Sequence, residues 1–328
     1  MLVLTRSDLE QVLPFDVCID EMRTAMIATS ERRCVLPIRQ FMPVPGRPGK
    51  LGLMPGYIGG ESECFGVKIV SKYERAPGDP HGSHVGAVLL LDASTGLPIA
   101  LLEGGTLTAI RTASMTALAT DALARSDARR LAMLGTGEEA WYHVRALVHV
   151  RPFDDILIWG RSPQRAGALV ERLRAAGIGG VRVVGDVAEA LAQADVACTV
   201  TSAKEPFVRG EWLRPGLHLN LVGSAIPTTA EVDDATVARG RFFVDYIDAA
   251  RAAAGELLSA IRNGVVREDH VAGEIGEVLL GRVPGRRAAD EITIYKSLGV
   301  TTQDLAAGHR AWREARARGL GQSLELDR

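Results

Sequence analysis

Residues 131–162 read LAMLGTGEEAWYHVRALVHVRPFDDILIWGRS, and this segment gives the clearest indication of the fold class. It begins with a short apolar run, residues 131–134, that has the length and composition of a buried parallel strand. A turn of the pattern G-x-G-x-x-A starts at Gly135, and after it we expect a helix over residues 138–148 and a second strand over residues 156–159. This order predicts a βαβ unit that binds a dinucleotide.

Each small residue of the turn has an expected role. Gly135 permits the tight turn, Gly137 lets a pyrophosphate approach the backbone, and Ala140 lets the helix pack close to the strand. The helix N-terminus presents unpaired N–H groups to the phosphates. We therefore expect the cofactor to contact the whole turn, including Thr136 and Glu138.

The end of the second strand predicts which cofactor binds. An NAD site carries an acidic residue here for the ribose 2′-OH, whereas this chain has Trp159-Gly160-Arg161-Ser162. The guanidinium of Arg161 and the hydroxyl of Ser162 are suited to a 2′-phosphate. NADP(H) is therefore favoured, with NAD(H) as the alternative; a second alternative is that Arg161 is a solvated turn residue.

Length and charge exclude several classes of function. A chain of 328 residues predicts about two domains. Its net charge of −2, with acidic and basic residues interspersed, provides no basic surface for nucleic acid. No apolar run approaches the roughly 20 residues of a membrane span, and the first residues do not resemble a secretory signal, so we expect a cytoplasmic protein. The cysteines are scattered, and the sequence shows no cluster of metal ligands.

Two buried cations are predicted in the first part of the chain. Residues 65–73, FGVKIVSKY, belong to a mostly antiparallel set of strands, and Lys68 interrupts this apolar strand. Residues 106–124 predict a helix whose small and apolar face carries Arg111. Burial of either charge is costly unless the charge is paired or used. For Arg111 the partner is either an anionic ligand or a carboxylate of the protein.

The βα alternation continues after residue 162 and predicts a doubly wound parallel sheet. Ligand contacts in such a sheet lie at the carboxyl ends of the strands. Near these ends, and in the helix before the glycine turn, we expect further cofactor contacts: Thr201, Val222, Ser224, Ser297 and Thr108. Residues 301–304, TTQD, resemble a capping box for a last helix that runs to about residue 318.

The predicted architecture is α/β with two domains. A smaller α+β domain for substrate binding and dimerisation covers residues 1–117 and is completed by residues 297–328. The Rossmann-type dinucleotide-binding domain covers residues 118–296. Apolar strands over residues 65–70 and 85–91 lack enough nearby sequence to cover both faces, so we expect a homodimer formed through the smaller domain.

A series of motifs runs through the chain in this order: GVKIV, STGLPIALLEG, TAIRTA, GTGEEA, IWGRS, LNLVGS, GEIGEVLLGR and DEITIYKSLG. Together they resemble the ornithine cyclodeaminase and mu-crystallin family over essentially the whole chain. The resemblance implies that the carboxylate of a small amino or imino acid is held by Arg39, from an early strand, together with Lys68 and Arg111.

Two departures from the family pattern bear on the reaction. The cyclodeaminases carry a glutamate and an aspartate at the positions of Gly52 and Ala225, and both carboxylates would be needed to handle a second amino group. Gly52 and the pair Ser83-His84 instead resemble the mu-crystallin and ketimine-reductase branch. His84 either donates to the substrate or is a satisfied loop histidine.

The resemblance therefore implies an NAD(P)H-dependent reductase of imino acids such as pyrroline- or piperideine-2-carboxylate. Arg39 and Arg111 would fix the carboxylate, and Lys68 would be the proton donor to nitrogen or a third carboxylate contact. Burial near two arginines is expected to lower the pKa of Lys68. The alternatives are an enzyme of the cyclodeaminase, alanine dehydrogenase or hydroxyproline dehydratase type, and an NADPH-dependent binding protein of the mu-crystallin type.

Overall fold

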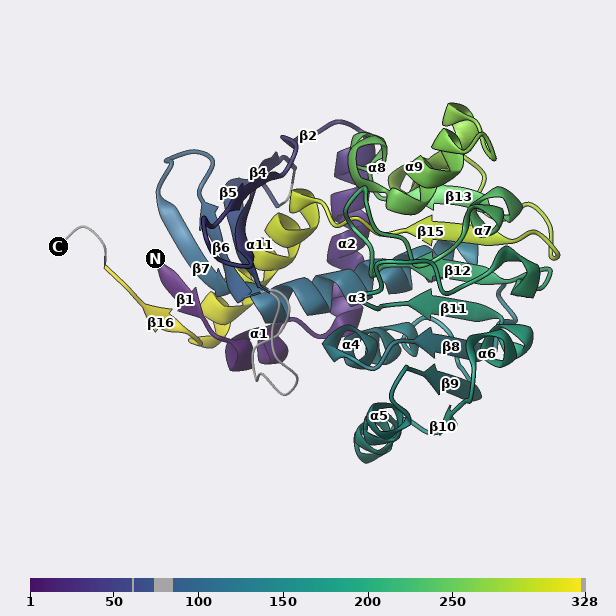
Figure 1. Cartoon of the computed structure of the whole chain (residues 1–328). Coiled ribbons are helices and arrows are strands. Elements are labelled where there is room, and N and C mark those ends of the chain that lie inside the picture. Colours follow the sequence, from purple (N-terminus) through teal and green to yellow (C-terminus); the bar gives the residue numbers. More distant parts are fainter. Residues whose placement is uncertain (61, 74–84, 326–328) are drawn as a thin grey trace. The chain divides into compact units, whose positions relative to one another are not determined.

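The computed structural model describes residues 1–60, 62–73 and 85–325 (Figure 1). The chain divides into two compact units. Unit 1 comprises Met1–Thr112 together with Val300–Arg328, and unit 2 comprises Ala113–Gly299. Within the described residues, no helix is both long and apolar enough to cross a membrane.

Unit 1 is built on a mixed sheet with the strand order β16-β1-β7-β6-β5-β4-β2, and β3 also pairs with β4. The pairing of β1 with β7 is parallel, and the central strands pair antiparallel, as the sequence predicts. The strands are β1 (Leu2–Leu4), β2 (Cys34–Val35), β3 (Gln40–Pro43), β4 (Gly49–Ile58), β5 (Cys64–Tyr73), β6 (Val85–Leu91), β7 (Pro98–Glu103) and β16 (Gln322–Ser323). The helices are α1 (Arg6–Val12), α2 (Phe15–Ser30), α11 (Thr301–Arg318) and the first part of α3 (Gly104–Leu123).

The two faces of this sheet differ in burial. Side chains alternate between the faces of a strand, and in β5 the buried Lys68 and Val70 flank Ile69, which is 37% exposed. Helix α11 packs on β4, β5 and β6, and α2 packs on α11. The face that carries Lys68 is therefore covered by helix, whereas the face of Ile69 is half-exposed and apolar.

Unit 2 is built on a sheet with the strand order β10-β9-β8-β11-β12-β15-β13-β14. Every pairing in it is parallel, which confirms the predicted doubly wound α/β fold. Its strands are β8 (Arg130–Leu134), β9 (Asp155–Trp159), β10 (Val181–Val183), β11 (Val196–Thr199), β12 (His218–Leu221), β13 (Arg241–Val244), β14 (Val271–Glu274) and β15 (Thr293–Lys296). Its helices are α4 (Glu138–Leu147), α5 (Pro163–Ala175), α6 (Val187–Gln193), α7 (Asp234–Arg239), α8 (Ile247–Ala253), α9 (Gly255–Arg262) and α10 (Ile275–Leu279), with short 3-10 turns η1 (Gly210–Trp212) and η2 (Glu268–His270).

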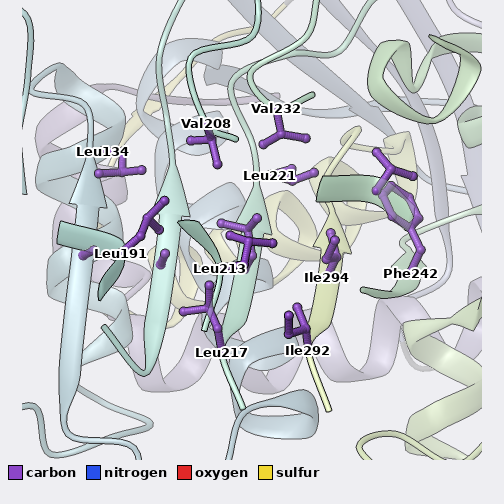
Figure 2. Packing of buried hydrophobic residues seen from close by; sticks show 14 of the residues in the cluster. Leu134, Leu191, Val208, Leu213, Leu217, Leu221, Val232, Phe242, Ile292 and Ile294 are labelled. Atoms are coloured by element: carbon purple, nitrogen blue, oxygen red, sulfur yellow. The ribbon is translucent and has the colours of Figure 1, made fainter. Parts of the chain in front are cut away.

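The core of unit 2 lies between this sheet and the helices on one of its faces (Figure 2). Leu134, Leu221 and Ile294 come from three of the strands, and Leu191 comes from α6. All four are fully buried. This apolar layer holds the strands in register, so that their ends form a fixed edge.

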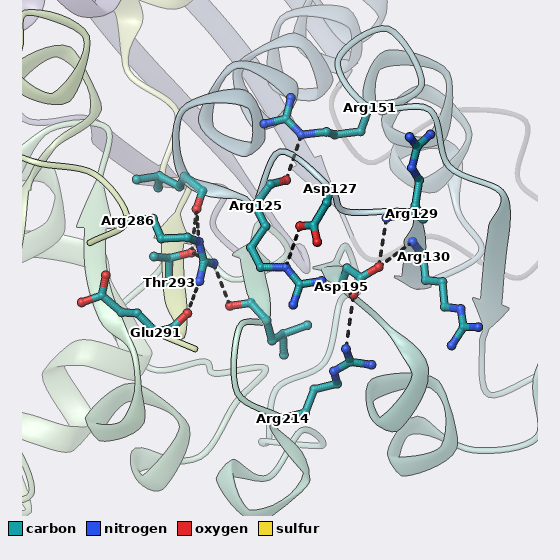
Figure 3. Close-up of polar contacts among 12 residues, drawn as sticks. Arg125, Asp127, Arg129, Arg130, Arg151, Asp195, Arg214, Arg286, Glu291 and Thr293 are labelled. Atoms are coloured by element: carbon teal, nitrogen blue, oxygen red, sulfur yellow. Dashed lines mark hydrogen bonds and ion pairs between the residues drawn. The ribbon is translucent and has the colours of Figure 1, made fainter. Parts of the chain in front are cut away.

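The amino ends of these strands are joined by a polar network (Figure 3). The carboxylate of Asp195 accepts hydrogen bonds from the backbone N–H groups of Arg129 at 2.9 Å and Arg130 at 3.0 Å, and it forms an ion pair with Arg125 at 2.9 Å. Arg286 donates to Thr293 Oγ1 at 2.8 Å. The charges of Asp195 and Arg286 are thus satisfied by the protein itself. Ligand contacts in such a sheet lie at the opposite, carboxyl ends of the strands.

Candidate active site

The glycine turn of unit 2 has the geometry that a dinucleotide-binding loop requires. Gly135 has φ +143°, and a Cβ there would lie 2.7 Å from Val200 Cγ2 and 2.9 Å from Val200 O, so only glycine fits. Gly137 is the N-cap of α4, and a Cβ built on it would meet nothing within 4 Å. Ala140, in the first turn of α4, is fully buried. The turn therefore leaves open space in front of a helix N-terminus, where backbone N–H groups attract anions.

The strand end after β9 packs against this turn. A Cβ on Gly160 would lie 2.5 Å from the Thr136 side chain, so a larger residue would displace the turn. Ser162 is the N-cap of α5, and its hydroxyl accepts from the backbone N–H of Arg165 at 3.3 Å. Arg161 is exposed. Within the described residues it forms no ion pair, so its guanidinium is available to a ligand.

A carboxylate that the sequence analysis missed ties together the loops after β11 and β12. Glu231 accepts from the backbone N–H and the hydroxyl of Thr201, each at 2.7 Å, and from the Gly223 N–H at 2.8 Å. Burial raises the pKa of Glu231, although these hydrogen bonds oppose the shift. The hydroxyl and the backbone N–H of Thr201 are therefore both already engaged by the protein.

The other predicted cofactor contacts are mostly buried, and two of their hydroxyls are hydrogen-bonded within the protein. The Ser224 hydroxyl donates to Thr229 O at 2.7 Å, and the Ser224 carbonyl accepts from the buried Lys296, which also pairs with Glu256 at 3.1 Å. Val222 is half-buried, and Ser297 is 3% exposed. In unit 1, the Thr108 hydroxyl donates to Gly104 O at 2.5 Å within α3. The hydroxyls of Ser224 and Thr108 thus hold a loop and a helix in place, which is a structural role that the sequence does not distinguish from ligand contact.

Unit 1 brings Lys68 and Arg111 to one carboxylate, that of Asp304 in α11. Lys68 Nζ and Arg111 Nε each donate to Asp304 Oδ1 at 3.0 Å. Arg111 also donates through Nη1 to Gln303 Oε1 at 2.8 Å. The Lys68 and Arg111 side chains are 3% and 5% exposed, and that of Asp304 is 0% exposed. The carboxylate partner that was one of the two alternatives for Arg111 is therefore present, and it is shared with Lys68.

The predicted capping box at residues 301–304 is wrong. Helix α11 has Val300 as its N-cap, without a side-chain hydrogen bond to the cap. Asp304 lies inside the helix and accepts from the two cations, and the hydroxyl of Thr302 lies 2.9 Å from that of Thr29. A buried lysine and a buried arginine both need an anion, and that requirement was the signal in the sequence for such a carboxylate.

The charged groups of this cluster shift one another's pKa values. Burial lowers the pKa of Lys68 to about 8, with a further lowering from Arg111, while Asp304 opposes the shift. Burial acts to raise the pKa of Asp304, but the charges of Arg111 and Lys68 outweigh it, and this pKa lies below its ordinary value. Two cations and one carboxylate leave a net charge of +1. This charge suits a monoanion, such as the carboxylate of a small acid.

The remaining predicted substrate contacts are only partly placed by the structure. Arg39 is half-buried and lies one residue before β3, not within a strand. It is close enough to Lys72 to lower the pKa of that lysine. Ser83 and His84 lie outside the described residues. Within those residues, no group of three histidine, cysteine or acidic side chains is arranged to hold a metal ion.

The chain is similar to known proteins over most of its length. A model of the Ornithine cyclodeaminase/mu-crystallin family matches residues 1–317. Ketimine reductase mu-crystallin of Mus musculus is 35% identical over 271 residues, which cover 83% of this chain and 82% of that protein. A Delta(1)-pyrroline-2-carboxylate reductase of Bacillus cereus is 30% identical over 327 residues, 99% of this chain and 100% of that protein.

A solved structure shares the fold along the full chain. Thermococcus litoralis Delta(1)-pyrroline-2-carboxylate reductase, in complex with NADH and L-proline, matches with a TM-score of 0.94 and 31% identity, covering 99% of this chain and 100% of that one. The family model and these relatives match far more of the chain than any single motif does. The chain belongs to the ornithine cyclodeaminase/mu-crystallin family.

Proposed function

We propose that the protein is a nicotinamide-dependent reductase of small imino acids, with NADP(H) favoured over NAD(H). The observation that carries the proposal is the buried cluster of Lys68, Arg111 and Asp304, whose net charge of +1 matches a single carboxylate. The relatives named as reductases of ketimines and of pyrroline-2-carboxylate support the same class of substrate.

The substrate carboxylate is bound by N–H groups of Arg111 and Lys68 that have no partner among the described residues. Arg111 engages Asp304 and Gln303 through Nε and Nη1, and its Nη2 has no hydrogen bond to any of the described residues. Lys68 has three N–H donors and directs one of them to Asp304. The family resemblance adds Arg39 as a third contact to the carboxylate. Such positioning supplies much of the rate of a reaction at a neighbouring atom.

Reduction of C=N needs a hydride at carbon and a proton at nitrogen. When bound, the dinucleotide supplies the hydride. Lys68 holds the proton, because a pKa of about 8 keeps it protonated near neutrality while making the proton easier to release than that of an ordinary lysine. Asp304 keeps the ammonium in place through its 3.0 Å hydrogen bond. The amine product gains one proton, and Lys68 regains it from solvent.

The cofactor assignment rests on the glycine turn and the strand end after β9. The open space at Gly137, the positive φ of Gly135 and the buried Ala140 all fit a pyrophosphate at the N-terminus of α4. Exposed Arg161 supplies a guanidinium for a 2′-phosphate, and Ser162 supplies a hydroxyl that also caps α5.

Gly52 and Ala225, the two departures from the family pattern, disfavour cyclodeamination. A Cβ on Gly52 would lie 2.9 Å from Phe41 Cε1 and 3.0 Å from Val70 Cγ1, so the Phe41 ring occupies the space above Gly52. Ala225 carries no charge. An ornithine ammonium would therefore find no carboxylate at either position and would be repelled by the cations of the site.

The experiment is a comparison of substrates with one enzyme preparation. Oxidation of NADPH and of NADH is followed with pyrroline-2-carboxylate and piperideine-2-carboxylate, and ammonia release from ornithine is followed with NAD present. We expect reduction of the cyclic imines, faster with NADPH, and little or no ammonia from ornithine. Efficient ammonia release from ornithine, or the absence of any imine reduction, would overturn the proposal.

A further inference from the structure

The helix-covered face of the unit 1 sheet carries more positively charged side chains than are needed to bind one substrate carboxylate. The register of β4 and β5 places Lys50 directly opposite Lys72. Because alternate residues share a face of a strand, Lys72 lies on the same face as Lys68, about 13 Å further along the strand. Both Lys50 and Lys72 are half-buried, and lysine side chains are long and flexible.

An aromatic ring contacts both of these ammonium groups. Phe41 lies opposite Gly52 in the register of β3 and β4. The centre of its ring is 4.5 Å from Lys50 Nζ and 6.0 Å from Lys72 Nζ. Gly52 is two residues from Lys50 along β4, so the ring stands between the lysine pair and the position of Lys68. This contact holds the two ammonium groups near each other without neutralising them.

Two like charges directly opposite each other on neighbouring strands destabilise a sheet. Burial lowers the pKa of Lys72 to about 8, and Arg39 and Lys50 lower it further. Within the described residues no carboxylate forms an ion pair with Lys50 or Lys72, in contrast to Lys68, which has Asp304. A lysine pair kept at this cost, on the same face as a carboxylate site, indicates an anionic ligand.

We propose that Lys50 and Lys72 bind a second carboxylate of the substrate, at the opposite end from the carboxylate held by Arg111 and Lys68. The preferred substrate is then an imino dicarboxylate. The Phe41 ring packs against the carbon chain between the two carboxylates. This inference rests on the proposed reductase function and adds the class of side chain that the site selects.

The test compares two substrates in the wild type and in the double variant Lys50→Met/Lys72→Met. The substrates are the imine formed from oxaloacetate and ammonia, which has two carboxylates, and pyrroline-2-carboxylate, which has one. Loss of two charge-assisted contacts should lower kcat/KM for the dicarboxylate by about 100-fold or more. The value for pyrroline-2-carboxylate should change less than about threefold, and Lys72→Arg should retain most activity on the dicarboxylate.

A loss of equal size on both substrates, or no loss on either, would overturn the proposal. A binding measurement tests the second carboxylate site independently of the proposed reaction. Calorimetric titration with succinate and with propanoate should show that the wild type prefers succinate and that the double variant has lost the preference. Succinate preference without any imine reduction would keep the second carboxylate site and reject the reductase. Imine reduction without a preference for dicarboxylates would keep the reductase and reject the second site.

Discussion

Asp304 Oδ1 accepts a hydrogen bond from Lys68 Nζ at 3.0 Å, in surroundings where neither side chain is more than 3% exposed. The other carboxylate oxygen, Oδ2, is buried and has no hydrogen-bond partner among the described residues. An unpaired buried acceptor is costly, because the oxygen has lost its contacts with water without gaining a donor. The carboxylate thus holds both cations of the cluster through Oδ1 alone.

Replacement of Lys68 by methionine should abolish imine reduction while leaving binding of NADPH intact. The lysine belongs to unit 1, whereas the glycine turn belongs to unit 2. Loss of a general acid lowers kcat by roughly 100-fold or more. Steady-state kinetics and a fluorescence titration with NADPH measure the two effects. Lys68→Arg separates the roles, because it keeps the charge for the carboxylate but holds its proton too tightly. A methionine variant that reduces the imine as fast as the wild type would contradict the assignment.

The rate of imine reduction should fall as the pH rises through about 8, where Lys68 loses its proton. Asp304 favours the protonated lysine, so Asp304→Asn should lower the pKa of Lys68 further. The alkaline limb of the profile of kcat/KM against pH should therefore move to lower pH in this variant. Thermal melting identifies the pH range in which the variant is folded, and the profile is measured there. An alkaline limb that stays in place would show that Asp304 does not act through Lys68.

Arg161→Ala should weaken binding of NADPH far more than binding of NADH. Only NADPH carries the 2′-phosphate that a guanidinium would pair with, and the loss of one charge-assisted contact corresponds to an order of magnitude or more in Kd. Calorimetry with both cofactors measures the difference. Arg267→Ala removes an arginine whose side chain is 87% exposed and serves as the matched control, with no change expected for either cofactor. Equal losses for NADPH and NADH would reject this role of Arg161.

The half-exposed face of the unit 1 sheet should form a homodimer interface. Large exposed apolar side chains concentrate in unit 1: Val35, Ile38, Met42, Ile69, Tyr73, Leu97 and Leu324. Light scattering on the wild type should give twice the chain mass of 35.1 kDa. Ile69→Asp should shift the mass toward that of one chain, because burial of an unpaired carboxylate is costly.

Val183→Asp is the control for the dimer, because Val183 has a similar exposure of 40% but lies in unit 2. Its mass should equal that of the wild type. A wild-type protein that is monomeric at micromolar concentration would contradict the interface.

Local pattern and the cost of buried charge account for the features that were predictable from the sequence. The strand, turn and helix around Gly135 were predictable because each has its own local signal, and Lys68 and Arg111 were conspicuous as charges in apolar segments. Asp304 was missed because the acidic residue of a TTQD segment also fits a helix cap. Its pairing with Lys68 is a contact across 236 sequence positions, which no local pattern contains. Ser162 shows the same ambiguity, since one hydroxyl suits both a phosphate and an N-cap.

Because Asp304 follows Lys68 by 236 positions, the order of synthesis separates the two partners in time. A ribosome adds roughly 5–20 residues per second, so the lysine emerges on the order of 10 to 50 seconds before its carboxylate. Ala113–Gly299 is continuous in the chain and can fold as soon as it has been made. The first segment of the chain must wait for α11 before its two cations can be buried. We therefore expect unit 1 to fold last in the cell, and its strands to be the part of the nascent chain that depends most on chaperones.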